Sequence, residues 1–158
     1  MRRIRRDQAG QAEYGHDALD VSIDLQCRIA PPFLRAPSFD ELWQRRLVVH
    51  LPGGPVDALG DHDLVLALCL HGLRHGWERS QWVVDVALLA TGIESDQWPA
   101  IQAEAERWGA RRVVALGLGI AETTTGLQLD GPGLAWLRSD RKAARRAASA
   151  SAALFVRM

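Results

Sequence analysis

The chain has few cysteines, no excess of either charge and no long apolar run. Its 158 residues include two cysteines, Cys27 and Cys69, too few for a disulfide framework, which favours a reducing compartment. Nineteen basic and nineteen acidic side chains cancel, so the whole chain has no field that attracts nucleic acid or a membrane. There is no signal-peptide h-region and no apolar run of membrane length. We therefore expect a cytoplasmic protein with no nucleic-acid or membrane partner.

Common catalytic motifs are missing as well. The sequence contains no phosphate-cradling glycine loop, no Ser-His-Asp elbow and no dinucleotide-binding fingerprint. The charge bias that exists lies at the two ends, which are rich in arginine: Arg2, Arg3, Arg5 and Arg6, then Arg138, Arg141, Lys142, Arg145 and Arg146. We interpret these ends as solvated segments rather than binding patches.

The most informative stretch runs from Leu64 to Leu89. A helix from Asp61 to about His75 is apolar nearly all round, which indicates burial. His71 and His75 lie four residues apart on it, and a second helix places Trp82, Asp85 and Leu89 on one face. Buried polar groups need partners, so we predict that Asp85 is buried and within hydrogen-bond reach of His71 or His75.

Three interpretations of this cluster stay open. The rings and the carboxylate form structural hydrogen bonds, or they face a substrate, or they bind zinc with Asp85 as a third ligand and water as a fourth. No second pair of histidines or cysteines supports a metal site. We expect no stoichiometric zinc, because three ligands without a fixed fourth make a poor structural site.

The rest of the chain mixes one strand signal with several helix signals. Side chains alternate from Asp20 to Ile29, which predicts a half-buried strand, and a turn at Gly15-His16-Asp17 suggests a weaker strand before it. Further helices are predicted from Ser38 to about Val48, from Ser95 to Trp108, from Arg111 to about Thr124 and from Leu134 to Phe155, with a turn at Leu51–Pro55. Most tryptophans, namely Trp43, Trp82, Trp98 and Trp108, are expected in the core, and Trp77 is expected to border a pocket.

Asp24 lies on the polar face of the predicted strand, as does Asp20. A carboxylate there is usually solvated, but such strands also present Mg²⁺ ligands in phosphoryl-transfer enzymes. From the pattern alone, the solvated interpretation is favoured.

The ensemble of residues resembles a known family. The relevant motifs are Val21-Ser-Ile-Asp24-Leu25-Gln26-Cys27-Arg28, then Leu66-x-Leu68-Cys69-x-His71-Gly72-x-x-His75-x-Trp77-x-Arg79-x-x-Trp82-x-x-Asp85, then Trp98 and Ala105-x-x-Trp108-Gly109. In order and spacing they resemble the uncharacterised nucleotidyltransferase family of bacterial proteins, from about residue 11 to about residue 127. The resemblance implies an N-terminal nucleotidyltransferase core joined to a helical half, with Asp24 as a metal carboxylate of the core.

The chain also departs from that family's pattern. Gln26 and Cys27 stand where the strand motif usually has histidine and tryptophan, and the Gly-Ser turn and Asp-x-Asp pair that precede the strand are not seen. We therefore expect a truncated, catalytically incomplete chain, with residues 1–30 a hairpin remnant of the core and 31–158 a helical domain.

The expected fold is α+β and predominantly helical, a short N-terminal β-hairpin packed on about five to seven helices. The expected function is nucleotidyltransferase-like: transfer of a nucleotidyl group from a nucleoside triphosphate to an unknown acceptor, inactive in this chain unless an intact core supplies the remaining Mg²⁺ ligands. Asp24 would bind metal, and His71, His75 and Asp85 would border the acceptor. The alternative is a non-catalytic helical interaction module, and in either case a protein partner at the hairpin edge is expected.

Overall fold

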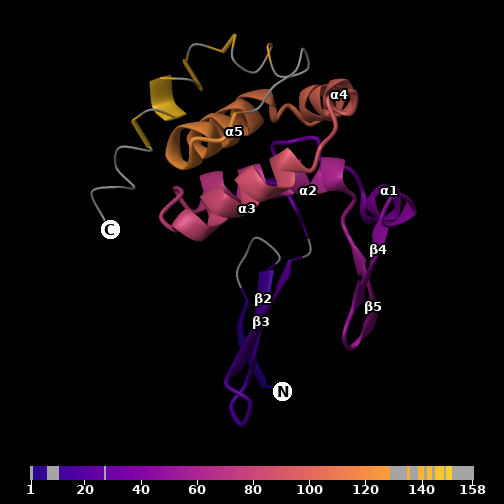
Figure 1. The fold of residues 1–158 in the computed structure, drawn as a ribbon. Helices are drawn as coiled ribbons and strands as arrows, with labels where there is room; N and C mark the ends of the chain where they lie inside the picture. Colours follow the sequence, from indigo (N-terminus) through magenta and orange to yellow (C-terminus); the bar gives the residue numbers. More distant parts are fainter. Residues whose placement is uncertain are drawn as a thin grey trace. The chain divides into compact units, whose positions relative to one another are not determined.

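The structure, a computed structural model, describes residues 2–6, 11–26 and 28–128, then 135, 139, 140, 142, 143, 145–147, 149 and 150. For residues 2–6 and 11 it describes the backbone alone. The chain divides into two compact units, residues 1–34 and 35–158. The predicted class is confirmed, because the fold is α+β and mainly helical (Figure 1). Among the described residues, no helix is long and apolar enough to cross a membrane.

The first unit is built on a three-stranded antiparallel sheet. Its strands are β1 (Arg2–Arg6), β2 (Gln11–His16) and β3 (Val21–Gln26), in the order β1-β2-β3. The predicted strand and its weaker partner are therefore present as β3 and β2, although the turn between them lies at residues 17–20. The third strand, β1, was not predicted, because its run of arginines shows no alternation of apolar and polar residues.

The β3 strand is exposed, and the prediction that it is half-buried is wrong. Ala12, Tyr14 and His16 of β2 lie opposite Leu25, Ile23 and Val21 of β3, so these six residues share one face. On that face Val21, Ile23 and Leu25 remain 47%, 49% and 53% exposed. Alternation shows which side of a strand is apolar, but burial requires a second layer to cover that side.

Between residues 35 and 128 the structure describes five helices and a hairpin of the second unit. They are α1 (Phe39–Gln44), β4 (Leu47–Leu51), β5 (Gly54–Ala58), α2 (Asp61–Arg74), α3 (Ser80–Thr91), α4 (Trp98–Trp108) and α5 (Arg111–Thr125). The predicted helices at α2 to α5 are confirmed within a few residues. Gly109 and Gly126 end α4 and α5 in the left-handed conformation, with φ of 72° and 71°.

The predicted helix from Ser38 to Val48 is only half right. It begins with the expected capping box, in which the Glu41 N–H donates to Ser38 Oγ and the Ser38 N–H donates to Glu41 Oε2. It ends at Gln44, because Leu47–Leu51 forms β4 and pairs with β5 across the turn at residues 52–53. The β-branched residues of this segment favour a strand once β5 is available as a partner.

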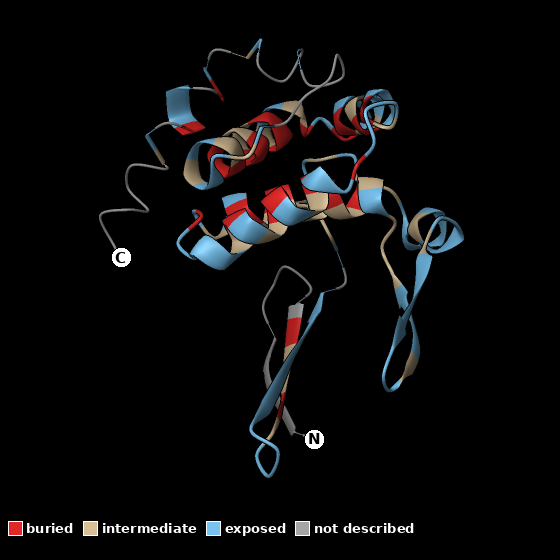
Figure 2. Ribbon diagram, in the orientation of Figure 1, coloured by how far each residue is buried: buried red, intermediate tan, exposed pale blue. Residues whose placement is uncertain are grey.

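The core lies among α2, α3, α4 and α5, where the buried faces meet (Figure 2). The predicted burial of Trp98 and Trp108 is confirmed, at 2% and 0% exposed. Trp82 is only half-buried. Trp43 is 44% exposed, so its prediction as a core residue is wrong; it stacks on Phe39 at the surface instead, with ring centroids 5.6 Å apart.

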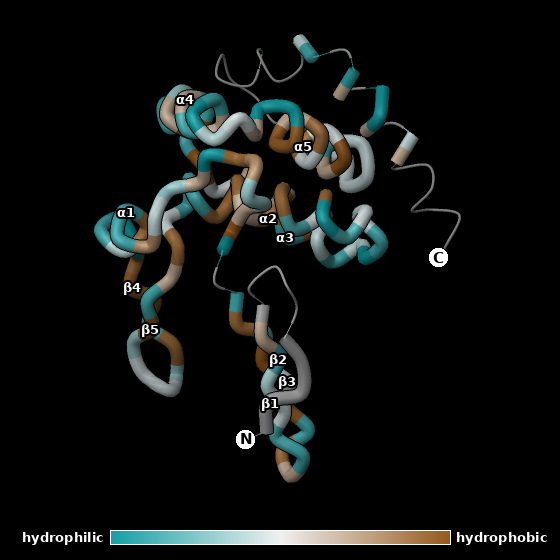
Figure 3. Tube along the Cα trace, turned by 180° about the vertical axis from the view of Figure 1, so that it is seen from behind, coloured by the Kyte–Doolittle hydropathy of each residue, from teal (hydrophilic) through white to brown (hydrophobic). Residues whose placement is uncertain are grey.

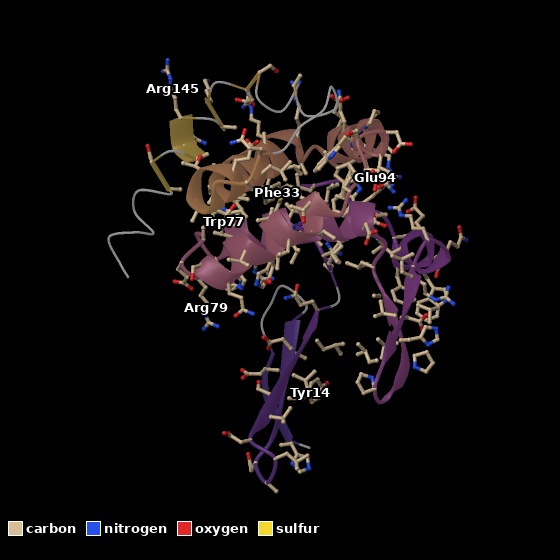
Figure 4. All side chains as sticks on the ribbon, in the orientation of Figure 1. Tyr14, Phe33, Trp77, Arg79, Glu94 and Arg145 are labelled. Carbon is tan, nitrogen blue, oxygen red and sulfur yellow. The ribbon has the colours of Figure 1, made fainter. Side chains whose placement is uncertain are left out.

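Trp77 is a core residue, and its expected place at the border of a pocket stays a prediction. It is 3% exposed and has a positive φ of 56° at the corner between α2 and α3. Its ring packs on two glycines, Gly72 of α2 and Gly117 of α5, which allow the two helices to approach it closely (Figure 4). Cys69 lies in the same contact, and burial raises the pKa of its thiol to about 12, so the thiol stays protonated.

Cys27, in the predicted N-terminal strand, and most of the predicted C-terminal helix, Leu134 to Phe155, lie outside the described residues. Within that predicted helix, the described residues 142–143, 145–147 and 149–150 are helical. Arg138 and Arg141 of the basic end also lie outside the described residues.

We predict that Gly117→Ala destabilises the helical unit. A Cβ at this position would lie 2.6 Å from Cys69 Sγ and 3.1 Å from the Trp77 ring, and both neighbours are buried. Overpacking of this kind costs about 1–3 kcal/mol. The control is Gly92→Ala, whose Cβ would meet only the Leu89 carbonyl at 3.5 Å. Urea denaturation followed by circular dichroism measures both, and equal midpoints for the two variants would contradict the prediction.

Candidate functional site

The residues singled out from the sequence fall in both units. Asp24 belongs to the sheet of the first unit, whereas His71, His75 and Asp85 belong to α2 and α3 of the second. Each group is described by its own geometry.

Asp24 is an exposed residue of β3 that lies directly opposite Glu13 of β2. Facing residues of antiparallel strands have Cβ atoms about 4.5–5.5 Å apart, and two like charges at this distance destabilise the sheet. Glu13 accepts a hydrogen bond from Ser22 Oγ at 3.1 Å, which orients one of its oxygens on the same polar face. The two carboxylates are hard oxygen ligands of the kind that Mg²⁺ prefers, so their chemistry fits that ion.

Glu13 was missed from the sequence, because the strand pattern of β2 is weak. Its alternation is diluted by Gly15 and His16, so nothing in the order of residues indicates which of them faces Asp24. The register of β2 on β3, with Glu13 opposite Asp24 and Gly15 opposite Ser22, supplies that information.

The histidine pair forms a three-ring cluster with Trp82. The His71 and His75 ring centroids are 4.7 Å apart, and each lies 5.1 Å from the centroid of the Trp82 ring. The cluster spans the corner between α2 and α3, and all three side chains are half-buried. The guanidinium carbon of Arg79, on the exposed side of the same corner, lies 5.7 Å from the Trp82 ring centroid (Figure 4).

Asp85 lies on α3, the helix that also carries Trp82. It is half-buried rather than buried, because α3 turns Val83, Val86 and Ala87 into the core and leaves Asp85 at the margin. The predicted burial of Asp85 is therefore wrong, and its pairing with His71 or His75 stays a prediction.

No three-ligand metal set is formed by these residues. Across the described residues there is no group of three His, Cys, Asp or Glu side chains that could hold a metal ion. The cluster consists of two imidazoles and an indole, and each of the three side chains is partly accessible to solvent. Such a cluster can stack on a planar group, and its imidazole nitrogens can donate or accept hydrogen bonds.

The carboxylate that is buried is Asp63, in the first turn of α2. It is 1% exposed and pairs with Arg45, whose Nη2 donates to Asp63 Oδ1 at 2.7 Å while Nε donates to Oδ2. The same Nη2 also donates to Glu104 of α4 at 2.7 Å. Sequence reasoning missed this residue because an aspartate at a helix start is usually an exposed cap.

Glu104 links that ion pair to a second arginine. Arg107 Nε donates to Glu104 Oε2 at 2.9 Å, and Trp108 Nε1 donates to Oε1 at 3.1 Å. Burial alone would raise the pKa of Glu104, but the hydrogen bonds from Arg107 and Trp108 and the charge of Arg45 outweigh burial and hold the pKa below 4.5.

A hollow of about 790 Å³ lies apart from the predicted residues, at the corner of α4 and α5. It is lined by Glu106, Gly109, Arg111, Arg112, Ser139, Asp140 and Lys142. Arg112 pairs with Asp140 at 3.4 Å, and Arg111 donates to Ser139 Oγ at 3.3 Å, so charges of both signs in the wall satisfy one another.

Comparison with known proteins decides the family. Residues 3–126 match the family described as uncharacterised nucleotidyltransferase, and this range includes Asp24, the histidine pair and Trp82. The chain belongs to this family. No curated protein and no solved structure matches it. The matched range spans both units, so the resemblance seen in the residue motifs extends over the sheet as well as the helices.

We predict that Arg45→Gln is strongly destabilising. It leaves the buried carboxylate of Asp63 without its ionic partner, which costs about 3 kcal/mol. The adjacent variant Arg46→Gln is the control, because its contacts lie at the surface: an ion pair with Asp57, whose side chain is 43% exposed, a hydrogen bond to the Trp43 carbonyl and a contact with the Trp43 ring. Their loss should cost less than about 1 kcal/mol. Guanidinium denaturation of the two variants provides the measurement. A loss no larger for Arg45→Gln than for Arg46→Gln would show that the pair does not stabilise the fold.

We predict that acid weakens the fold partly through Glu104. Because its pKa in the folded chain is below 4.5, the unfolded chain takes up the proton first as the pH falls. Its contribution to the free energy of unfolding is therefore complete above the unfolded pKa and is lost as the pH falls towards the folded pKa. Thermal midpoints between about pH 7 and pH 3 should fall less steeply in Glu104→Gln than in the wild type. The control Glu106→Gln removes an exposed carboxylate from the same helix, and an identical effect of both variants would refute the assignment.

Proposed function

We propose that the sheet of the first unit contributes Asp24 and Glu13 to a metal site for nucleotidyl transfer, and that this site is incomplete. The observation that supports this function is the register of β2 on β3, which places the two carboxylates opposite each other in a member of a nucleotidyltransferase family. When bound, Mg²⁺ would neutralise charge on a triphosphate. Asp24 and Glu13 would hold the ion and position it on the polar face of the sheet.

Two carboxylates are a weak site for Mg²⁺, because the ion gives up its water reluctantly unless several ligands converge. Efficient nucleotidyl transfer also needs groups that hold the triphosphate in line with the acceptor. We therefore infer that the isolated chain binds Mg-ATP poorly and transfers no nucleotide by itself.

The histidine pair is proposed as the contact for the acceptor. His71 and His75 are half-buried, are held by contact with Trp82 and lie on the rigid corner of two packed helices. An imidazole in such a position can accept a proton from an acceptor hydroxyl or amine when that group attacks phosphorus. Asp85, half-buried on α3, would border the acceptor as well.

We predict weak metal binding that depends on the sheet carboxylates. Mn²⁺ replaces Mg²⁺ as a paramagnetic probe, and its binding should be measurable only at millimolar concentration and should disappear in Asp24→Asn and Glu13→Gln. Asp96→Asn, which removes an exposed carboxylate from a turn before α4, is the matched control. Incubation with labelled nucleoside triphosphates, Mg²⁺ and cell extract tests activity, and no label should be transferred.

Two results would contradict this proposal in different ways. Label transfer that vanishes in Asp24→Asn but persists in Asp96→Asn would show a complete enzyme rather than an incomplete one. Mn²⁺ binding that is unchanged in both Asp24→Asn and Glu13→Gln would show that the sheet face is not the metal site.

A further inference from the structure

A hairpin arm extends from the second unit without support from the helices. The arm comprises β4 and β5, and it projects away from α2 to α5 (Figure 1). Its strands pack on each other far more extensively than on any helix in the described part of the chain. At its base the chain closes tightly, since a Cβ on Gly60 would lie 2.7 Å from the Arg45 carbonyl oxygen.

One face of this arm is apolar and exposed. The register pairs Leu47 with Ala58, Val49 with Val56 and Leu51 with Gly54, so these side chains share a face. Leu47, Val49, Leu51 and Val56 are 43%, 40%, 52% and 44% exposed, and the apolar strand is visible in Figure 3. An isolated two-stranded hairpin is marginally stable in water, so this arm needs a further strand or a covering layer.

The two edges of the arm differ in their capacity to accept a strand. Pro55 has no N–H, so His50 and Pro55 cannot be a hydrogen-bonded pair of the hairpin. Hydrogen-bonded and non-hydrogen-bonded pairs alternate, which makes Val48 and Asp57 the next non-hydrogen-bonded pair. Hence the backbone groups of Pro55 and Asp57 point to the outer edge of β5. The backbone N–H and C=O groups of Val48 and His50 point to the outer edge of β4.

The β5 edge is guarded and the β4 edge is open. Proline and a charged side chain are the usual devices that prevent pairing at a sheet edge. The β4 strand, Leu47-Val-Val-His-Leu51, has neither, and among the described residues no other backbone group bonds to its outer N–H and C=O groups. The open edges of the N-terminal sheet differ, because β3 carries Asp24 and β1 is rich in arginine.

We propose that two copies of this chain pair through β4, antiparallel, about a two-fold axis at Val49. The sequence suits this symmetry, because Leu47 then faces the partner's Leu51 and Val48 faces the partner's His50. The outward backbone groups of Val48 and His50 meet those of the partner as hydrogen-bonded pairs, while Val49 and the partner's Val49 form the close, non-hydrogen-bonded pair.

A second copy fits this edge for two physical reasons. A two-fold axis at Val49 places each β4 residue opposite the residue that lies equally far from Val49 on the other side. No charged residue of β4 then faces a like charge of the partner. The pairing also yields a four-stranded sheet in which both rows of Leu47, Val49 and Leu51 lie side by side on one apolar face. The interface is small compared with standard protein interfaces, so the dimer is expected to be weak and dependent on concentration.

Sedimentation of the full chain from about 1 μM to about 1 mM tests the dimer, a range suited to a weak interface. A monomer should convert to a dimer as concentration rises. Val48→Pro removes an outward N–H that the hairpin itself does not use, and it should weaken dimerisation at least tenfold. Asp57→Pro, directly opposite on the guarded edge, is the matched control and should leave dimerisation within about twofold, the loss of the exposed Arg46 ion pair being small. Circular dichroism confirms that both variants are folded.

A cross-link tests the register. In a Cys27→Ser background, Val49→Cys should form a disulfide between the two copies, because facing Cα atoms of a non-hydrogen-bonded pair lie about 4.5 Å apart. Cys69 is buried and stays protonated, so it does not compete. Val56→Cys, on the same face but on β5, the outer strand of the four-stranded sheet, should not cross-link.

A chain that remains monomeric to millimolar concentration would overturn the proposal. So would a dimer that Val48→Pro leaves intact, since another surface would then carry it. A dimer that is lost in Val48→Pro but cross-links through Val56→Cys instead of Val49→Cys would overturn the two-fold register.

Discussion

The fold of the second unit depends on one buried ion pair. Asp63 begins α2 inside the protein, and its carboxylate is tolerable there only because Arg45, just beyond the end of α1, contacts both of its oxygens. Arg45 also contacts Glu104 of α4, so three segments far apart in the sequence meet at one guanidinium. The planar fork of arginine suits this geometry, which a lysine could not reproduce. Arg45 also lies at the base of the hairpin arm, because its carbonyl oxygen packs closely against Gly60. The arm, β4 and β5, is the part of the chain between these two residues.

The close approach of helices in the core determines where the histidines lie. Gly72 and Gly117 leave room for the Trp77 ring between α2 and α5, and Trp77 in turn makes the corner that leads into α3. This corner brings Trp82 back against His71 and His75. The three-ring cluster is therefore held by core packing, while one edge of it stays accessible to solvent, which is the condition for a residue that must contact another molecule.

Both sheets of this protein expose an apolar face. The N-terminal sheet leaves Val21, Ile23 and Leu25 uncovered, and the hairpin arm does the same with Leu47, Val49 and Leu51. The polar face of the first sheet carries Asp24 opposite Glu13, the pair proposed above to bind a metal ion. Exposed apolar faces of this kind mark surfaces of association.

The sequence by itself determined the helices α2 to α5, the start of α1 and the family. The periodicity of α2 to α5, the capping box of Ser38 and Glu41, and the spacing of His71, His75 and Trp82 are local features, governed by contacts between residues a few positions apart. Only the tertiary structure decided which carboxylate is buried, since Asp63 and Asp85 look alike as acids on apolar helices and differ only in whether Arg45 reaches them. The tertiary structure also decided that Leu47–Leu51 is a strand and that Glu13 faces Asp24. The strand β4 depends on pairing with β5, and the facing pair depends on the register of β2 on β3. Contacts between different strands set both, and the local order of residues does not contain them.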